Sequence, residues 1–201
     1  MLPPEGGAML KDKLTALGVQ WHLGTSVQSV DTANGAYTLT LANGATLQSD
    51  IVLSAVGLKP RTALAAAAGI KVNRGIVADR NLATSAPDVY TLGDCAEIEG
   101  MVMPYVMPIM HASRALAQTL TGKTTAVSFP AMPVMVKTPA CPTIVAPPAI
   151  GAAGSWQVAA TADGVKSLFN SADGKLLGFA LNGAATAERA KLAPQLPPVL
   201  A

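Results

Sequence analysis

The dipeptide Gly93-Asp94 is the position in this sequence where residue type and spacing point most directly to chemistry. It follows the apolar run 89–92, which predicts a short strand that would deliver the Asp94 carboxylate to the carboxyl edge of a sheet. Ligands bind at that edge in open α/β folds. Gly93 lets a ligand approach the backbone, and Asp94 can accept hydrogen bonds from the vicinal hydroxyls of a sugar or ribityl chain. A Gly-Asp pair also forms plain turns and helix caps, and the dipeptide alone leaves both interpretations open.

Other residues with reactive side chains show no comparable pattern. His22 and His111 have no carboxylate or nucleophile at a recognised spacing, so we assign neither a role in acid–base catalysis. Cys95 and Cys141 lie far apart, without a C-x-x-C pair or metal-ligand spacing, which argues against dithiol chemistry and a structural metal. We expect Cys95, which follows Asp94 directly, to be a small buried hydrophobic residue.

The composition excludes several classes of partner. The 201 residues are 50% hydrophobic and 13% charged, which predicts a globular, soluble chain. The 14 basic and 12 acidic residues are dispersed, with a net charge of +2 and no basic cluster that would follow a nucleic-acid backbone. No stretch reaches the roughly 18 uncharged apolar residues of a membrane span, and the first residues lack the order of a signal peptide. We therefore expect a cytoplasmic protein that binds neither nucleic acid nor membrane.

The first quarter of the chain predicts one helix and then a β-meander. Leu10, Leu14 and Leu17 share a helical face, and Gly18 is placed to end the helix. Strands are expected in the next apolar runs, at 19–23, 26–31, 36–41 and 45–57, with hairpin turns at Asn34-Gly35 and Asn43-Gly44. The last of these runs predicts a buried strand over 50–56.

The middle of the chain predicts the elements that would position Asp94. Residues 58–88 indicate a short alanine-rich helix with turns, ahead of the strand expected at 89–92. A second helix is predicted from about Pro108 to Leu120, with Gly122 placed to cap it. One face of this helix carries Ile109, Ser113, Leu116 and Leu120.

A separate unit is expected after Gly122, because many prolines enter the sequence there. Prolines suit edge strands and linking turns better than a central sheet. The later apolar runs predict strands joined by hairpins at Asp163-Gly164 and Asp173-Gly174, and a short helix is expected near 184–192. This end of the chain therefore predicts a small α+β domain.

Two motifs resemble the flavoprotein reductases that carry two dinucleotide-binding domains. The segment TSAPDVYTLGD, residues 84–94, looks like their second FAD-binding motif, and DIVLSAVGLKPR, residues 50–61, looks like the junction between their NAD and FAD domains. Within that family, the segments 105–120, 132–142 and 178–185 resemble bacterial rubredoxin reductases. The resemblance covers essentially the whole chain.

The resemblance implies an α/β fold class: a partial two-dinucleotide-binding-domain flavoprotein with a small C-terminal α+β domain. Residues 1–56 would be the end of the NAD-binding domain, 57–122 the second segment of the FAD-binding domain, and 123–201 the C-terminal domain. The G-x-G-x-x-G loops that bind the pyrophosphates of FAD and NADH in such enzymes do not occur in the 201 residues. We therefore expect the chain to carry only part of an FAD site.

The resemblance also implies roles for individual residues. Asp94 would hold the ribityl chain beside Gly93, Val106 would present its backbone to the pyrimidine edge of the flavin, and Lys137 would reach the isoalloxazine ring. Val106 precedes the predicted helix, whose free N–H groups and positive dipole end can stabilise negative charge on the reduced flavin. Lys137 ends a predicted strand and could donate to a flavin carbonyl or nitrogen. Without the resemblance, a strand-end lysine indicates a solvated side chain.

The activity that the resemblance implies is electron transfer from NADH through FAD to rubredoxin or a similar small iron protein, in alkane hydroxylation. The protein's share of such chemistry is to position and tune the cofactor. Two alternatives stay open: a sister reductase for a ferredoxin-like acceptor, and a non-catalytic truncated remnant that binds a partner through its C-terminal domain. The sequence does not decide between NADH and NADPH.

Overall fold

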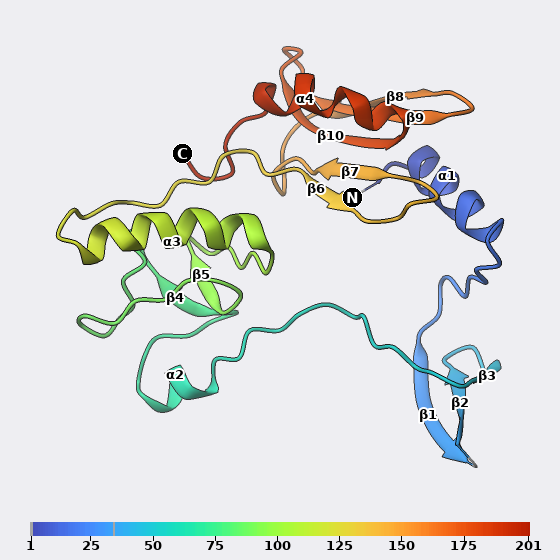
Figure 1. Ribbon diagram of the computed structural model, residues 1–201, viewed down its shortest axis with the longest axis horizontal. Helices are drawn as coiled ribbons and strands as arrows, with labels where there is room; N and C mark the ends of the chain where they lie inside the picture. The colour runs from blue at the N-terminus through green and yellow to red at the C-terminus, as the bar shows by residue number, and fades with distance from the viewer. Residues whose placement is uncertain (1, 34) are drawn as a thin grey trace. The chain divides into compact units, whose positions relative to one another are not determined.

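The computed structural model describes residues 2–33 and 35–201. These residues form two compact units (Figure 1). The first unit joins the described residues up to Leu14 with Leu58–Ala201, and the second unit is Thr15–Gly57. Both helices and strands are present, so the mixed α/β character expected from the sequence is confirmed.

The second unit is the predicted antiparallel meander. Its strands are β1 (Val27–Ala33), β2 (Ala36–Leu41) and β3 (Thr46–Ser49), in the order β1-β2-β3. Ala33 pairs with Ala36 across the first hairpin; the turn predicted at Asn34-Gly35 includes Asn34, which lies outside the described residues. In the second hairpin Gly44 has a φ of +84°, a left-handed conformation that glycine adopts without steric cost.

Two strands predicted in this unit are wrong. Residues 19–23 form no strand, and residues 50–56 form an extended segment outside any described sheet. Within that segment Ile51 is 80% and Leu53 is 87% exposed, so it is not the buried strand that its apolar run predicts. An apolar strand is buried only where neighbouring strands pair with its backbone and other elements cover its faces, and the described residues supply neither here.

The first unit contains the elements around Asp94. They are α2 (Ala63–Ala67), β4 (Ile76–Ala78), β5 (Ala96–Ile98) and α3 (Val106–Leu120). Strands β4 and β5 are parallel, with Ile76 opposite Ala96. An apolar core joins β5 to α3 and to the segment that follows α3; its buried members are Leu82, Ala96, Ile98, Ala112, Ala115, Val127, Phe129 and Met132.

Helix α3 is present as predicted, but it buries a different face. Its buried residues are Pro108, Ala112 and Ala115, whereas Leu120 is 65% exposed. Small side chains on the buried face let the helix backbone approach the core closely. Gly122, with a φ of +93°, follows the end of the helix as expected.

The strand predicted at 89–92 is also wrong. Only Tyr90 forms a bridge there, to Ala83, and the regular strand β5 begins after the Gly-Asp pair instead of before it. The run is short, and among the described residues its pairing with the segment before it is limited to this bridge and the two backbone hydrogen bonds beside it, Thr84 N–H to the Val89 carbonyl and Thr91 N–H to the Leu82 carbonyl. Asp94 therefore stands at the start of a strand and not at the carboxyl end of one.

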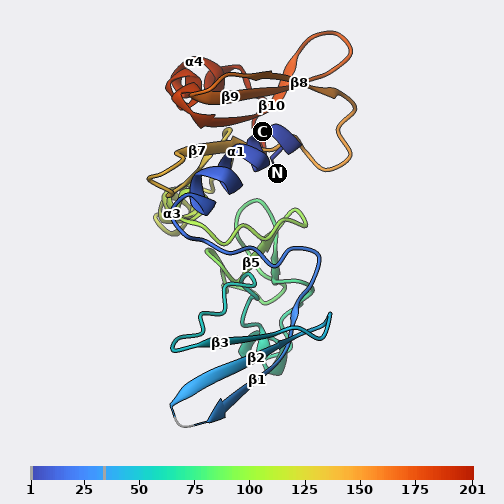
Figure 2. The ribbon, with the colours of Figure 1, turned by 90° about the vertical axis from the view of Figure 1, so that its right-hand side faces the viewer.

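The C-terminal sheet has the order β6-β7-β10-β9-β8, with all neighbours antiparallel. Its strands are β6 (Val134–Val136), β7 (Thr143–Ala146), β8 (Ser155–Ala160), β9 (Gly164–Asn170) and β10 (Leu176–Gly183). The turn η1 (Ala184–Glu188), the helix α4 (Arg189–Leu192) and the turn η2 (Ala193–Gln195) follow β10, and Figure 2 shows α4 alongside the strands of this sheet. Leu192 belongs to the same apolar core as Phe179. The α+β arrangement expected at this end of the chain is confirmed, and these elements belong to the first unit.

Two further segments join the first unit together. The helix α1 (Pro4–Thr15) has its buried residue Gly6 against Asn182 of β10. Near the C-terminus, Leu200 pairs with Phe129, with N–H to carbonyl distances of 2.8 and 3.0 Å. The domain limits predicted at 56/57 and 122/123 stay predictions.

Candidate functional site

Gly93 and Asp94 open a tight turn that leads into β5. The Ala96 N–H donates to the Gly93 carbonyl at 3.0 Å, and Gly93 adopts a φ of +83°. That φ is strained for any residue with a Cβ, which explains glycine at this position. The Asp94 side chain is exposed, and no hydrogen bond is recorded for it among the described residues. Its carboxylate is therefore free to accept hydrogen bonds from a ligand.

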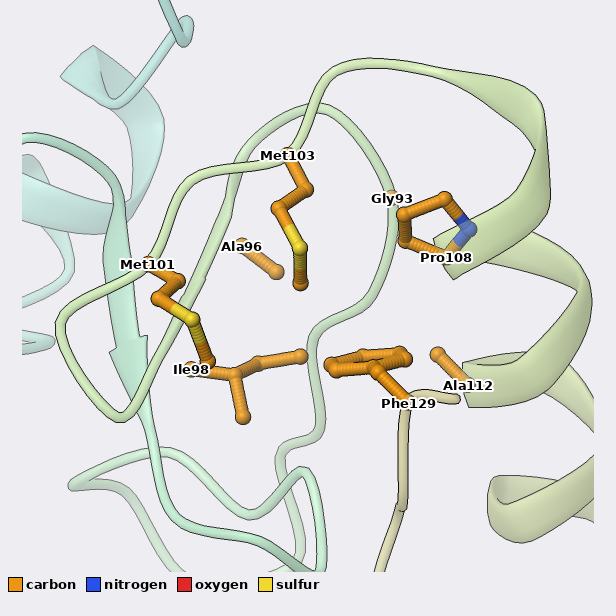
Figure 3. Close-up of a pocket in the computed structure, with 8 residues that line it drawn as sticks. All are labelled: Gly93, Ala96, Ile98, Met101, Met103, Pro108, Ala112 and Phe129. Atoms are coloured by element: carbon orange, nitrogen blue, oxygen red, sulfur yellow. The ribbon is translucent and has the colours of Figure 1, made fainter. Parts of the chain in front are cut away.

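The turn packs against the first two turns of α3. A Cβ placed on Gly93 would lie 3.9 Å from Cγ1 of Ile109, an ordinary van der Waals separation. Figure 3 shows Phe129 between Ile98 and Ala112, where these side chains line a pocket together with Gly93. The pocket has a volume of only about 10 Å³, which is at the limit for a single water molecule. The pocket is a small gap between the packed side chains of the turn and the helix. A ligand larger than a water molecule would therefore have to bind on the outer surface.

The N-terminal end of α3 offers unsatisfied backbone donors. Tyr105 precedes the helix in an extended conformation and its side chain makes no capping hydrogen bond. Val106 is the first residue of the helix, whereas the sequence predicted that it precedes the helix by one position. It is 69% exposed. The amides of Val106 and Met107 have no intrahelical acceptor, and Pro108 has no N–H to offer. This end of the helix is thus open to an anionic or hydrogen-bond-accepting group.

Lys137 directly follows β6, the edge strand of the C-terminal sheet, and its side chain is exposed. The strand ends at Val136, so Lys137 lies one position beyond the strand end at which it was predicted. The Lys137 side chain makes no hydrogen bond or ion pair among the described residues, so it is a solvated cation. Gly93 and Asp94, in contrast, lie in the turn that packs on α3.

Sequence reasoning missed the role of Glu97 in β5. Its side chain is 4% exposed, and its carboxylate accepts hydrogen bonds from the Gly75 N–H and from Nδ2 of Asn73, both at 2.9 Å. These two donors, and more weakly the charge of Arg74, hold the pKa of Glu97 below its usual range against the opposing effect of burial. The one signal in the sequence that could have indicated a buried, hydrogen-bonded Glu97 is its position between two apolar residues, Ala96 and Ile98, in a short run typical of a strand.

Neither cysteine forms a disulfide in the described part of the chain. Cys95 is half-buried and Cys141 is buried. His111 lies edge-on to Phe129, with ring centroids 6.5 Å apart. Within residues 2–33 and 35–201 no cluster of His, Cys, Asp and Glu side chains is placed to hold a metal ion. No helix in these same residues is long and apolar enough to cross a membrane.

Comparison with known proteins places these features in a family. Residues 1–119 match the family described as pyridine nucleotide-disulphide oxidoreductase, and residues 126–196 match the family described as rubredoxin binding C-terminal domain. The chain belongs to the pyridine nucleotide-disulphide oxidoreductase family. This finding confirms the resemblance and the expected fold class, a partial two-domain flavoprotein fold with a small C-terminal domain.

Individual relatives agree with this assignment. The chain is 49% identical over 201 residues to a rubredoxin-NAD(+) reductase of Alcanivorax borkumensis and 43% identical over 204 residues to one of Acinetobacter baylyi. It covers 53% and 52% of those two proteins, so it spans about half the length of the curated relatives that it matches. A solved ferredoxin reductase from Rhodopseudomonas palustris has the same fold, with a TM-score of 0.83 at 24% identity over 100% of this chain and 52% of that one.

Proposed function

We propose that this chain supplies the ribityl and flavin-ring side of an FAD site in an NADH:rubredoxin reductase. The observation that carries the proposal is the turn at Gly93 and Asp94, packed on the open N-terminal end of α3, in a chain that matches both a pyridine nucleotide-disulphide oxidoreductase and a rubredoxin-binding domain. The names of the relatives from Alcanivorax and Acinetobacter support rubredoxin as the electron acceptor. NADH would be the electron donor.

The residues present fit such a cofactor. Asp94 offers an exposed carboxylate without a recorded partner, as an acceptor for ribityl hydroxyls requires. Gly93 is not crowded by its surroundings, since a Cβ there would meet only Ile109, at 3.9 and 4.0 Å. The amides at Val106 and Met107 would donate to the pyrimidine edge, and Lys137 would donate to the ring from the C-terminal sheet.

When bound, FAD supplies two-electron acceptance from NADH and one-electron release to an iron centre. The chain's own residues orient and tune that group. The positive end of the α3 dipole and the Lys137 ammonium would stabilise negative charge on the reduced ring, while Asp94 would fix the ribityl chain. The segment 126–196 would receive the rubredoxin.

A hybrid protein tests the proposal. The part of the Alcanivorax relative that this chain does not cover would be joined to the 201 residues, and FAD content and NADH-dependent reduction of rubredoxin would be measured. We expect a yellow protein that reduces rubredoxin. A hybrid that folds, shown by circular dichroism, but retains no flavin would refute the FAD site. Reduction of a ferredoxin but not of rubredoxin would refute the proposed acceptor.

The same proposal includes the domain limits 1–56, 57–122 and 123–201. It also includes the use of the reduced rubredoxin in alkane hydroxylation. A cytoplasmic location is proposed from the dispersed charge and the two free cysteines, Cys95 and Cys141. Fractionation of cells that produce the tagged protein would test the location.

A further inference from the structure

We propose that Glu97 is a positioning residue for the flavin-binding turn: its buried carboxylate clamps the turn Asn73–Gly75 onto β5 and thereby fixes the backbone that carries Asp94. This inference rests on the FAD site proposed above. Glu97 itself is buried and would touch neither flavin nor substrate.

The clamp is built from two hydrogen bonds of equal length. One carboxylate oxygen of Glu97 accepts from the backbone N–H of Gly75 at 2.9 Å, and the other accepts from the side-chain amide of Asn73 at 2.9 Å. Glu97 is 4% exposed and Gly75 is buried, so water cannot take over the bond from the Gly75 N–H, whereas Asn73 is exposed and water can reach its amide. Hydrogen bonds to a charged acceptor are the strong ones, and a Gly75 N–H left without its acceptor would stay unsatisfied.

The clamped turn lies directly on the residue that follows Asp94. A Cβ placed on Gly75 would be 2.8 Å from the Cys95 carbonyl oxygen and 3.1 Å from Cβ of Glu97, so only glycine permits this approach. The next residue, Ile76, donates its N–H to that same carbonyl at 2.7 Å. The carbonyl of Cys95 is thus held from the side of the Asn73–Gly75 turn.

The same turn also holds the far end of β5. The Arg74 guanidinium donates to the carbonyl of Gly100, two residues beyond the strand. Its positive charge favours the ionised form of Glu97. The Asn73–Gly75 turn therefore contacts β5 and its flanking residues from Cys95 to Gly100. Between these two ends, Glu97 is the charged side chain that hydrogen-bonds to the turn in the described contacts.

Asp94 depends on this arrangement because its side chain makes no hydrogen bond among the described residues. Its backbone is fixed by the turn bond from the Ala96 N–H to the Gly93 carbonyl together with the hold on the next carbonyl, that of Cys95. A shift of the Cys95 carbonyl would move the Asp94 carboxylate away from the ribityl hydroxyls. Misplacement on the scale of 1 Å is enough to weaken a positioned contact strongly.

The test uses Glu97→Gln, which keeps the shape of the side chain but replaces one acceptor oxygen by a donor. In the hybrid protein we expect FAD to bind about tenfold more weakly, the loss typical of one charge-assisted hydrogen bond. The matched control is Glu99→Gln, two residues away on an exposed side chain, which should leave the affinity unchanged. In the 201-residue chain, Glu97→Gln should also accelerate hydrogen exchange of the Gly75 amide, a readout that needs no flavin.

A second-site rescue separates positioning from a general loss of stability. Adding Asn73→Asp to Glu97→Gln lets the new amide at position 97 donate to the new carboxylate at position 73, while its oxygen still accepts from the Gly75 N–H. We expect this double variant to regain most of the FAD affinity. If Glu97→Gln lowers thermal stability but leaves the FAD dissociation constant unchanged beside a wild-type hybrid that binds FAD, the positioning role is overturned. If the wild-type hybrid binds no FAD, the proposed function itself falls.

Discussion

Asn182 of β10 lies against Gly6 of α1 so closely that a Cβ on Gly6 would sit 2.5 Å from the Asn182 side-chain oxygen. Asn182 is fully buried and cannot turn away freely, since its Nδ2 donates to Oγ1 of Thr143 at 2.9 Å. Glycine at position 6 is therefore what allows the helix and the C-terminal sheet to touch.

Gly6→Ala should destabilise the chain, whereas Gly7→Ala should not. A Cβ at Gly7 meets nothing within 4 Å, so alanine there should add about 0.5–1 kcal/mol through better helix propensity. Alanine at position 6 gains the same propensity but must displace Asn182, and overpacking of this kind costs about 1–3 kcal/mol. Urea unfolding of the two variants checks the prediction; equal midpoints would show that α1 does not dock on Asn182.

Acid should remove the contribution of Glu97 to stability. Its pKa is lower in the folded chain than in the unfolded one, mainly because Gly75 N–H and the Asn73 amide bind the carboxylate, so the unfolded state holds more protons as the pH falls. The contribution is complete above about pH 4.3, the ordinary value for glutamate, and is lost as the pH falls towards the lowered value.

Glu97→Gln should therefore lower the free energy of unfolding at pH 7 by about 1–3 kcal/mol and by less at low pH. Urea unfolding at several pH values measures this difference. Glu99→Gln is the control, because it makes the same change of charge on an exposed side chain. Its free energy of unfolding should match that of the wild type at every pH. A constant gap between Glu97→Gln and wild type at all pH values would argue against the ionised clamp.

The sequence predicted the elements whose signals are local. The meander, α3 and the hairpins of the C-terminal sheet follow from alternation, helical spacing and turn residues, and all are present. The strands predicted at 19–23, 50–56 and 89–92 are wrong, because burial and pairing depend on partners that a short apolar run does not specify. In the site, Gly93 and Asp94 were found through their motif. Glu97 was missed because its partners, Asn73 and Gly75, are more than 20 residues away and become neighbours only through the parallel pairing of β4 and β5.

The 201-residue chain by itself should not retain FAD through purification. It holds no glycine-rich loop for the pyrophosphate, and the pocket beneath Gly93 has only about 10 Å³. Losing the contacts of the ADP half removes several kcal/mol, and each 1.4 kcal/mol is about a factor of ten in affinity. Absorbance near the flavin bands after gel filtration checks this. A yellow protein with one flavin per chain would contradict it.

Lys137→Ala should alter the flavin more than the fold. In the hybrid protein, loss of a cation near the ring would destabilise the reduced, negatively charged form and make the potential more negative by roughly 30–60 mV, which corresponds to one charged hydrogen bond in a two-electron couple. The exposed side chain predicts little change in thermal stability. Lys123→Ala, also at an exposed lysine, is the control. A lowered melting temperature with an unchanged potential would assign Lys137 a structural role.

Asp94→Ala gives the most direct test of the flavin site. The carboxylate is exposed, has no recorded partner among the described residues and lies outside the apolar core, so its removal should leave the fold and the unfolding midpoint unchanged. In the hybrid protein the same change removes a charged acceptor from the ribityl hydroxyls. Hydrogen bonds to charged groups contribute about 1.5–3 kcal/mol, so FAD affinity should fall by about one to two orders of magnitude.

Titration of the apo-hybrid with FAD, followed by flavin fluorescence, measures this loss. Asp50→Ala is the matched control, because Asp50 is also an exposed aspartate, lies in the second unit and is not part of the proposed site, so its removal should leave the dissociation constant unchanged. Gly93→Ala should weaken binding as well, since a φ of +83° strains the turn that presents Asp94. Were Asp94→Ala to bind FAD as tightly as the wild type, Gly93 and Asp94 would form a turn into β5 and nothing more. The site would then have to be sought at the end of α3 alone.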